Sequence, residues 1–177
     1  NVTNGALVAL QATTGEILVM VGSDDYNDPI DGQINMALRP RQPGSSIKPL
    51  VYLVGIDDKT MTASTMFMDV VTNFAPSGAK AFTPTQADGA ERGPVRLRSA
   101  LQFSLNVPAI KAGFLNGLEH QYERTKDFGL VYPKTAMPVA SQSIGTLEIH
   151  PIDMISAFGM IGNGGVLVPH HTIVKIL

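Results

Sequence analysis

The stretch Arg41-Gln42-Pro43-Gly44-Ser45-Ser46-Ile47-Lys48-Pro49 places a hydroxyl and an amine three residues apart, directly behind a Pro-Gly pair. Proline followed by glycine ends a preceding element, and the apolar positions within residues 47–54 have the spacing of a helix. Side chains three residues apart lie on the same face of a helix. The pattern therefore predicts that Ser45 lies in the first helical turn, with Lys48 as its neighbour.

Ser45 and Lys48 together have the chemistry of a nucleophile and its base. A serine hydroxyl becomes a good nucleophile when a nearby base takes its proton. A lysine that has lost its own proton through burial or neighbouring positive charge can be that base. Ser46 is only two residues from Lys48, about 200° away around a helix, so Ser45 is the better candidate. The same spacing also fits an ordinary polar first turn with a solvated lysine.

A second polar cluster, Ser104-Leu105-Asn106, lies between two segments with helical apolar spacing. Pro108 suits the first position of the second helix, and the residue before it is pushed away from helical backbone angles. An extended break would put Ser104 and Asn106 on one side and Leu105 in the core. A hydroxyl can relay a proton, and an amide can bind a peptide substrate. Alternatively, Ser104 is a helix-end hydroxyl and Asn106 caps the second helix.

Together the two motifs resemble the serine transpeptidase domain of penicillin-binding proteins, especially the bifunctional class A enzymes. The resemblance implies that Ser45 is the acylated nucleophile and Lys48 its activating base. It also implies that Ser104 passes a proton to the leaving amine and that Asn106 holds the substrate amide. Further segments follow in the order typical of the family, and they cover nearly the whole chain: residues 5–10, 14–22, 93–98, 104–109, 142–145 and 163–165.

The chain departs from the family pattern because no Lys-Thr-Gly motif follows the second motif. Lys134-Thr135-Ala136 lies between two prolines, is predicted to be a loop, and precedes the Gln142-Ser-Ile-Gly145 segment that should come before the third motif. In the family, that motif helps to bind the substrate carboxylate and to form the oxyanion hole. We therefore expect residues 1–177 to be a partial transpeptidase domain that lacks its C-terminal strands and is inactive alone.

The expected fold class is α+β, with the antiparallel sheet and helical subdomain of the β-lactamase and transpeptidase superfamily. A hairpin is predicted around Thr13-Thr14-Gly15, and the apolar character of its strands suggests cover on both faces. Residues 61–94 are expected to be mostly irregular. The remaining expected elements are hairpin strands at 6–12 and 16–21, helices at 119–128 and 152–161, and strands at 166–168 and 172–176.

Composition argues against nucleic-acid binding, because 13 basic and 15 acidic residues give a net charge of −2 without a basic block. The absence of cysteine excludes disulfides and fits a bacterial extracytoplasmic domain. Residues 154–174 lack Asp, Glu, Lys and Arg, but Asn163 and Pro169 interrupt this stretch, so it is not expected to span a membrane. Any membrane anchor should therefore lie upstream. The four histidines are scattered, and neither a metal nor a cofactor is expected.

The leading functional hypothesis is a peptidoglycan D,D-transpeptidase domain whose partners are stem peptides and β-lactam antibiotics, and also a missing C-terminal segment. One alternative keeps the acyl-serine chemistry but uses water as the acceptor, as in a D,D-carboxypeptidase or a β-lactamase-like hydrolase. A second alternative is a non-catalytic scaffold module with the same fold, which the missing Lys-Thr-Gly motif favours.

Overall fold

The computed structural model describes residues 4–176, and the predictions for residues 1–3 and 177 lie outside them. The chain divides into two compact units. The first contains residues 4–43, 126–135 and 148–176, and the second contains residues 44–125 and 136–147. Among the described residues, no helix is both long and apolar enough to cross a membrane.

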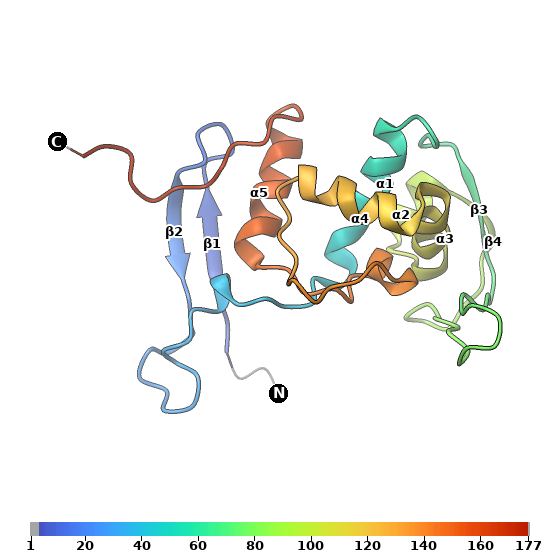
Figure 1. The fold of residues 1–177 in the computed structure, drawn as a ribbon, viewed down its shortest axis with the longest axis horizontal. Coiled ribbons are helices and arrows are strands. Elements are labelled where there is room, and N and C mark those ends of the chain that lie inside the picture. The colour runs from blue at the N-terminus through green and yellow to red at the C-terminus, as the bar shows by residue number, and fades with distance from the viewer. Residues whose placement is uncertain (1–3, 177) are drawn as a thin grey trace. The chain divides into compact units, whose positions relative to one another are not determined.

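The first unit is built on the predicted hairpin, in which β1 (Leu7–Leu10) pairs antiparallel with β2 (Ile17–Val21). The helix α5 (Pro151–Gly162) packs against β1 (Figure 1) and also contacts the short 3-10 turn η1 (Met36–Leu38). Pro151 suits the first position of α5, because the N–H that proline lacks would have no partner within the helix there. The predicted hairpin and the predicted helix at 152–161 are confirmed.

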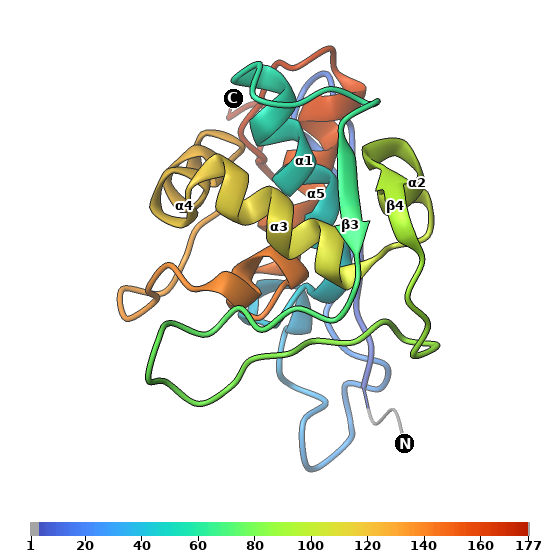
Figure 2. The ribbon, with the colours of Figure 1, turned by 90° about the vertical axis from the view of Figure 1, so that its right-hand side faces the viewer.

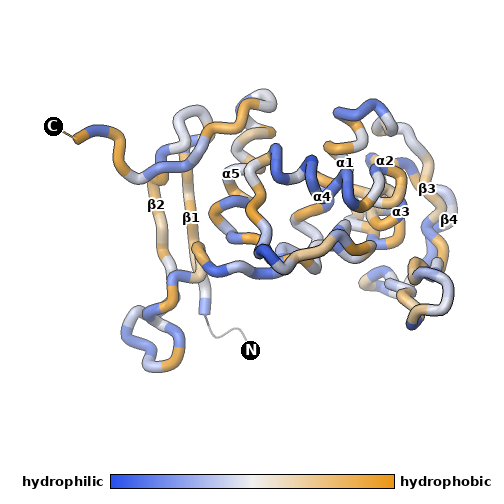
Figure 3. The backbone as a smooth tube through the Cα atoms, in the orientation of Figure 1, coloured by the Kyte–Doolittle hydropathy of each residue, from blue (hydrophilic) through white to orange (hydrophobic). Residues whose placement is uncertain are grey.

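The prediction that the hairpin is covered on both faces is wrong. Four apolar side chains of its strands are between 43 and 56% exposed: Leu7, Leu18, Val19 and Val21. Figure 3 shows that both strands are nonetheless dominated by apolar residues. In this unit α5 packs on β1, and its packing leaves those four side chains exposed.

The strands predicted at 166–168 and 172–176 do not form in the described part of the chain. Residues after α5 follow an irregular path, and their link to the hairpin is one isolated bridge between Glu16 and His171. Alternating or apolar residues make a strand only where a neighbouring strand offers a ladder of hydrogen bonds. Here two backbone bonds, Ile17 N to His171 O and His171 N to Gly15 O, take the place of that ladder.

The second unit is mainly helical, and its core lies where α3 (Asn106–Asn116) crosses α1 (Lys48–Asp57), as Figure 2 shows. The shorter helix α2 (Leu97–Gln102) leads into α3. α4 (Leu118–Asp127), close to the predicted 119–128, follows α3 and is mostly hydrophilic in Figure 3. The core side chains of α1 and α3 are fully buried: Leu50, Val51, Val54, Ala109, Ile110 and Ala112.

The region 61–94 is less irregular than predicted, because β3 (Met66–Asp69) pairs antiparallel with β4 (Gly93–Arg96). Gly93 and Pro94, the last residues of the region expected to be irregular, form the start of β4. Proline is tolerated in a two-stranded pair because it can occupy an edge position that needs no N–H donor. The long loop 70–92 connects these two strands and carries residues of the candidate site described next.

Candidate active site

Ser45 lies on an exposed 3-10 turn, η2 (Gly44–Ile47), which precedes α1. The prediction placed Ser45 inside the first turn of the α-helix, whereas α1 begins at Lys48. Pro49 explains the difference: an α-helical bond to the Ser45 carbonyl would need the N–H of residue 49, which proline lacks. A 3-10 turn still places residues three apart on one side, so the predicted relation of Ser45 and Lys48 holds.

Ser104 and Asn106 lie side by side at the junction of α2 and α3, and Leu105 between them is only 2% exposed. The prediction of two polar residues on one side and a core leucine between them is therefore confirmed. The backbone differs from the prediction, because Ser104 has a φ of 53°, in the left-handed region, and α3 begins at Asn106, two residues before Pro108. A non-glycine residue in this conformation costs about 1–2 kcal/mol, which surrounding contacts must offset.

The Lys48 amine makes contacts that hold Ser104 in this conformation. Its Nζ donates to the Ser104 carbonyl at 2.5 Å, to the Ser104 hydroxyl at 3.2 Å and to the Asn106 Oδ1 at 2.7 Å. The residue is only 1% exposed, so the alternative of a solvated lysine is wrong. Burial lowers the pKa of Lys48 to about 8, because a charged amine is disfavoured away from water.

Asn106 does not cap α3 with its side chain, contrary to the alternative considered from the sequence. Its Oδ1 accepts from Lys48, and its Nδ2 donates to the Thr85 carbonyl at 2.8 Å. Both ends of this amide are therefore engaged, one by the buried amine and one by the loop 70–92. The arrangement fixes which end of the amide faces Lys48.

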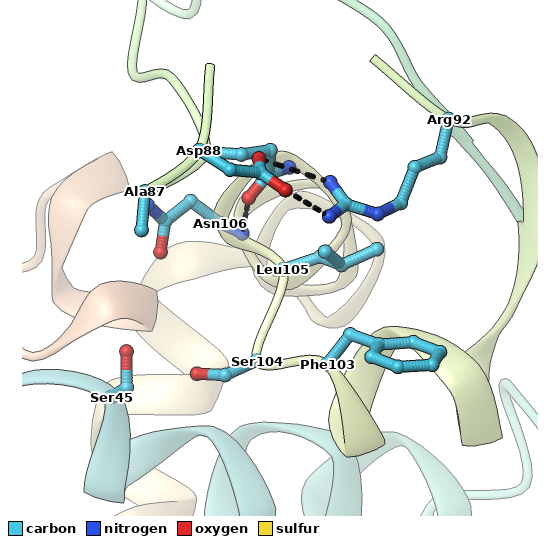
Figure 4. Close-up of a pocket in the computed structure, with 9 residues that line it drawn as sticks. Ser45, Ala87, Asp88, Arg92, Phe103, Ser104, Leu105 and Asn106 are labelled. Atoms are coloured by element: carbon cyan, nitrogen blue, oxygen red, sulfur yellow. Dashed lines mark hydrogen bonds and ion pairs between the residues drawn. The ribbon is translucent and has the colours of Figure 1, made fainter. Parts of the chain in front are cut away.

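A pocket of about 240 Å³ connects three of the four predicted residues, Ser45, Ser104 and Asn106. Figure 4 shows the Ser104 hydroxyl directed toward Ser45, whose own hydroxyl points into the space below Ala87 and Asn106. Lys48, the fourth residue, lies behind it and contacts Ser104 and Asn106. The structure thus brings all four predicted residues together at one place in the second unit.

Sequence reasoning missed two buried residues beside this group, Asp69 and Gln86. Gln86 accepts a hydrogen bond from the Asn106 backbone N–H at 2.7 Å and donates to Asp69, which is 1% exposed. The one available signal was a carboxylate that closes the apolar run Met66-Phe67-Met68, since a lone charge in such a run requires a buried partner. Nothing in the spacing pointed to Gln86.

An ion pair lines the same pocket. Arg92 Nη2 donates to Asp88 Oδ2 at 2.5 Å, and Figure 4 shows the two side chains facing each other. This hydrogen bond lowers the pKa of the Asp88 carboxyl. Both side chains are substantially exposed, so the pair contributes little to stability and leaves a polar rim beside the serines.

The turn that carries Ser45 rests on the segment Gln142-Ser-Ile-Gly145. Gly44 N donates to the Gly145 carbonyl at 3.2 Å, and Gly145 has a φ of 81°. A Cβ at position 145 would lie 2.1 Å from the Gly44 carbonyl oxygen. Only glycine allows this close approach of the two backbones, which sets the position of the turn before Ser45.

Lys134-Thr135 lies in an exposed turn outside any helix or strand, so the predicted loop is confirmed. An exposed serine, a buried lysine amine and a second hydroxyl lie at one pocket, a combination that is typical of serine acyl-transfer enzymes. The fold, with small antiparallel sheets and a helical unit, is the α+β fold expected for that class.

A family model described as penicillin binding protein transpeptidase domain matches residues 5–177, and the chain belongs to this family. Penicillin-binding protein 1A of Neisseria lactamica is 34% identical over 175 residues, which cover 97% of this chain and 21% of the relative. Penicillin-binding protein 1A of Escherichia coli K12 is 30% identical over 175 residues, which cover 98% of this chain and 20% of that relative. The chain thus spans about a fifth of the length of these curated relatives.

Solved structures agree with this assignment. Penicillin-binding protein 1A of Haemophilus influenzae superposes with a TM-score of 0.86 at 29% identity, covering 95% of this chain and 24% of that one. PonA1 of Mycobacterium tuberculosis, solved in complex with penicillin V, gives a TM-score of 0.80 at 19% identity over 94% of this chain and 45% of that one. At that identity the second comparison shows the shared fold alone.

Proposed function

We propose that this chain is part of a peptidoglycan D,D-transpeptidase in which Ser45 is the nucleophile and Lys48 its base. One observation carries the proposal: the buried Lys48 amine is bound to Ser104 and Asn106 beside the pocket that Ser45 lines. A lysine whose pKa lies near 8 is partly neutral at physiological pH, as a general base must be. Membership of the transpeptidase family supports the same reaction class.

In the first half-reaction, the neutral Lys48 amine takes the proton of the Ser45 hydroxyl as Oγ attacks the carbonyl between two terminal D-alanines. A bond forms from Oγ to carbon, and the peptide C–N bond then breaks. The Ser104 hydroxyl, within hydrogen-bond distance of Lys48, gives its proton to the leaving amine and receives in exchange the proton that Lys48 took, so Lys48 is neutral again. Terminal D-alanine departs, and the stem peptide remains esterified to Ser45.

In the second half-reaction, the amine of a neighbouring stem peptide attacks the ester carbonyl. Its nitrogen forms the new amide and loses a proton to Lys48 through Ser104, the bond to Oγ breaks, and Ser45 recovers that proton from Lys48. Asn106 is held between Lys48 and Thr85, and the second hydrogen of its Nδ2 would donate to the substrate carbonyl. A β-lactam would acylate the same hydroxyl and remain attached because its ester hydrolyses slowly.

The proposed substrate lies outside the cytoplasmic membrane of bacteria, so the complete protein would act as an extracytoplasmic enzyme, anchored by a segment outside this chain. The names of the relatives, penicillin-binding protein 1A from Neisseria lactamica and Escherichia coli, support this proposal. Neither a metal nor a cofactor has a step in the proposed reaction.

Intact-mass spectrometry of the protein expressed from its complete gene, incubated with benzylpenicillin, tests this proposal. We expect one covalent adduct on the wild type, none on Ser45→Ala, and an adduct on the matched control Ser46→Ala. An unmodified wild type, or an adduct that survives Ser45→Ala, would reject the assignment and favour the scaffold alternative. Product analysis with and without an amine acceptor then separates transfer from hydrolysis.

A further inference from the structure

One side chain of the loop 70–92 is buried and lies at the start of α3. Gln86 is 7% exposed, and its Oε1 accepts from the Asn106 backbone N–H at 2.7 Å. Asn106 is the first residue of α3, so its N–H has no partner within the helix. Leu105, at the N-cap position, has no side-chain oxygen to satisfy that N–H. Gln86 therefore supplies from another segment the cap that α3 lacks.

The direction in which the Gln86 amide points is fixed by its two neighbours. The Asp69 carboxylate can only accept hydrogen bonds, and the Asn106 backbone N–H can only donate one. Gln86 satisfies both when Nε2 faces Asp69 and Oε1 faces Asn106, which is the arrangement observed. If the amide were reversed, Nε2 would face the Asn106 N–H and Oε1 would face the Asp69 carboxylate, so neither hydrogen bond could form.

The charges around Asp69 come from several elements. Arg92 of the loop has its Nη1 3.8 Å from Asp69 Oδ2, an oxygen without a hydrogen-bond partner in the described chain. Burial and the charge of Asp69 raise the pKa of the Tyr52 hydroxyl on α1, which stays neutral. Asp88 is paired with Arg92. Asp69 is therefore a buried carboxylate whose direct hydrogen-bond donor from a side chain is Gln86.

We propose that Gln86 is a positioning residue for Ser45 acylation, which holds Asn106 against the Lys48 amine in an orientation set by buried Asp69. The inference rests on the proposed function, because it assigns a further residue to the same reaction. Gln86 has no contact with the reacting atoms in the proposed reaction. It acts through Asn106, whose Oδ1 is 2.7 Å from Lys48 Nζ.

The variant Gln86→Glu gives a signature that a merely structural role would not produce. The introduced carboxyl faces Asp69 and can replace the Nε2 donor only while it carries a proton. At low pH the shared proton keeps the network intact. At high pH the two carboxylates repel each other and Asn106 loses its support. Acylation of the variant should thus fall, relative to the wild type, as the pH rises.

The measurement is the rate of acylation by a fluorescent penicillin between pH 6 and 9, on the complete protein. We expect Gln86→Glu to be within about threefold of the wild type at pH 6 and about thirtyfold slower at pH 8.5, the size expected for one hydrogen bond to a charged group. Gln102→Glu, the same substitution at an exposed residue that ends α2, should follow the wild-type profile.

A double variant, D69N/Q86E, exchanges the two chemical groups. The amide at position 69 then donates to the carboxylate at position 86, which accepts from Asn106 without a shared proton. We expect this variant to recover most of the acylation rate at pH 8.5. Thermal melting of every variant reports its folding.

The outcomes separate the two proposals. A wild type that takes no penicillin rejects the proposed function. A wild type that is acylated, with a Gln86→Glu profile parallel to its own, overturns the positioning role alone. A profile merely shifted to higher pH also overturns it, since that indicates a charge effect on Lys48. If Gln86→Glu does not fold, a folded D69N/Q86E variant without recovered acylation rejects the role.

Discussion

The Lys48 amine combines deep burial with three oxygen partners, and its protonation state governs the proposed reaction at the scale of single residues. Burial lowers the pKa of Lys48 to about 8, so the neutral base increases as the pH rises toward that value. We predict that acylation of Ser45 rises about tenfold per pH unit between pH 6 and 7.5 and levels off above pH 8.5. Rapid-mixing fluorescence with a labelled penicillin measures this profile.

Lys48→Arg is the informative variant for this prediction, because a guanidinium stays protonated throughout the range and cannot act as a base. Its acylation should be at least about a hundredfold slower at pH 8. Lys111→Arg is the matched control, since Lys111 also donates to a backbone carbonyl, that of Met68, but is far less buried. A flat wild-type profile from pH 6 to 8 would contradict a lysine base.

Spacing along the chain fixes Ser45 near Lys48 and Ser104 near Asn106, and the packing of α1 against α3 brings these two predicted pairs together. Local spacing could not predict which partners hold them. Gln86 is separated from Asn106 by 20 positions and Asp69 from Gln86 by 17, so only the path of the loop 70–92 brings them together.

At the scale of elements, the turn η2 depends on the backbone of the segment that follows η3 (Ala140–Ile144). We predict that Gly145→Ala slows acylation at least about tenfold, because its Cβ would lie 2.1 Å from the Gly44 carbonyl oxygen and must displace the turn before Ser45. The acylation rate and the melting temperature should be measured together.

Gly164→Ala separates the steric effect from backbone strain. Gly164 also has a positive φ, 66°, but a Cβ there meets no atom within 4 Å. This control should cost about 1 kcal/mol of stability and leave the acylation rate unchanged. Equal acylation by the two alanine variants would show that the contact between Gly44 and Gly145 does not position Ser45.

Helices were predicted well where apolar spacing and a starting proline coincided, as in α5 with Pro151. Prediction failed where a partner decides the outcome. The pairing of β3 with β4 overrides the usual effect of Pro94, and residues 166–168 remain irregular although they are apolar. Strand formation depends on distant segments in a way that helix formation does not.

At the scale of the whole molecule, the hairpin presents apolar side chains to solvent. Leu7 pairs with Val21 and Ala9 with Val19, so Leu7, Val19 and Val21 lie on one face, each at least 43% exposed. We predict that the 177-residue chain alone self-associates at micromolar concentrations, since exposed apolar strands promote contacts between chains. Sedimentation velocity over a dilution series measures this.

The double substitution V19K/V21K should shift the sedimenting species toward monomer, because two charges would then occupy the exposed face. Ser141→Lys, which adds a charge outside the hairpin, should not. A wild-type chain that sediments as a single monomer at every concentration would contradict the prediction.

The left-handed backbone of Ser104 limits the substitutions that this position accepts. Branched residues such as valine or threonine fit poorly at a φ of 53°, and the Lys48 contact there needs an oxygen. Few single-codon changes meet both demands. An inhibitor that contacts the Ser104 hydroxyl would therefore bind at a position where few substitutions preserve both the backbone conformation and the Lys48 contact.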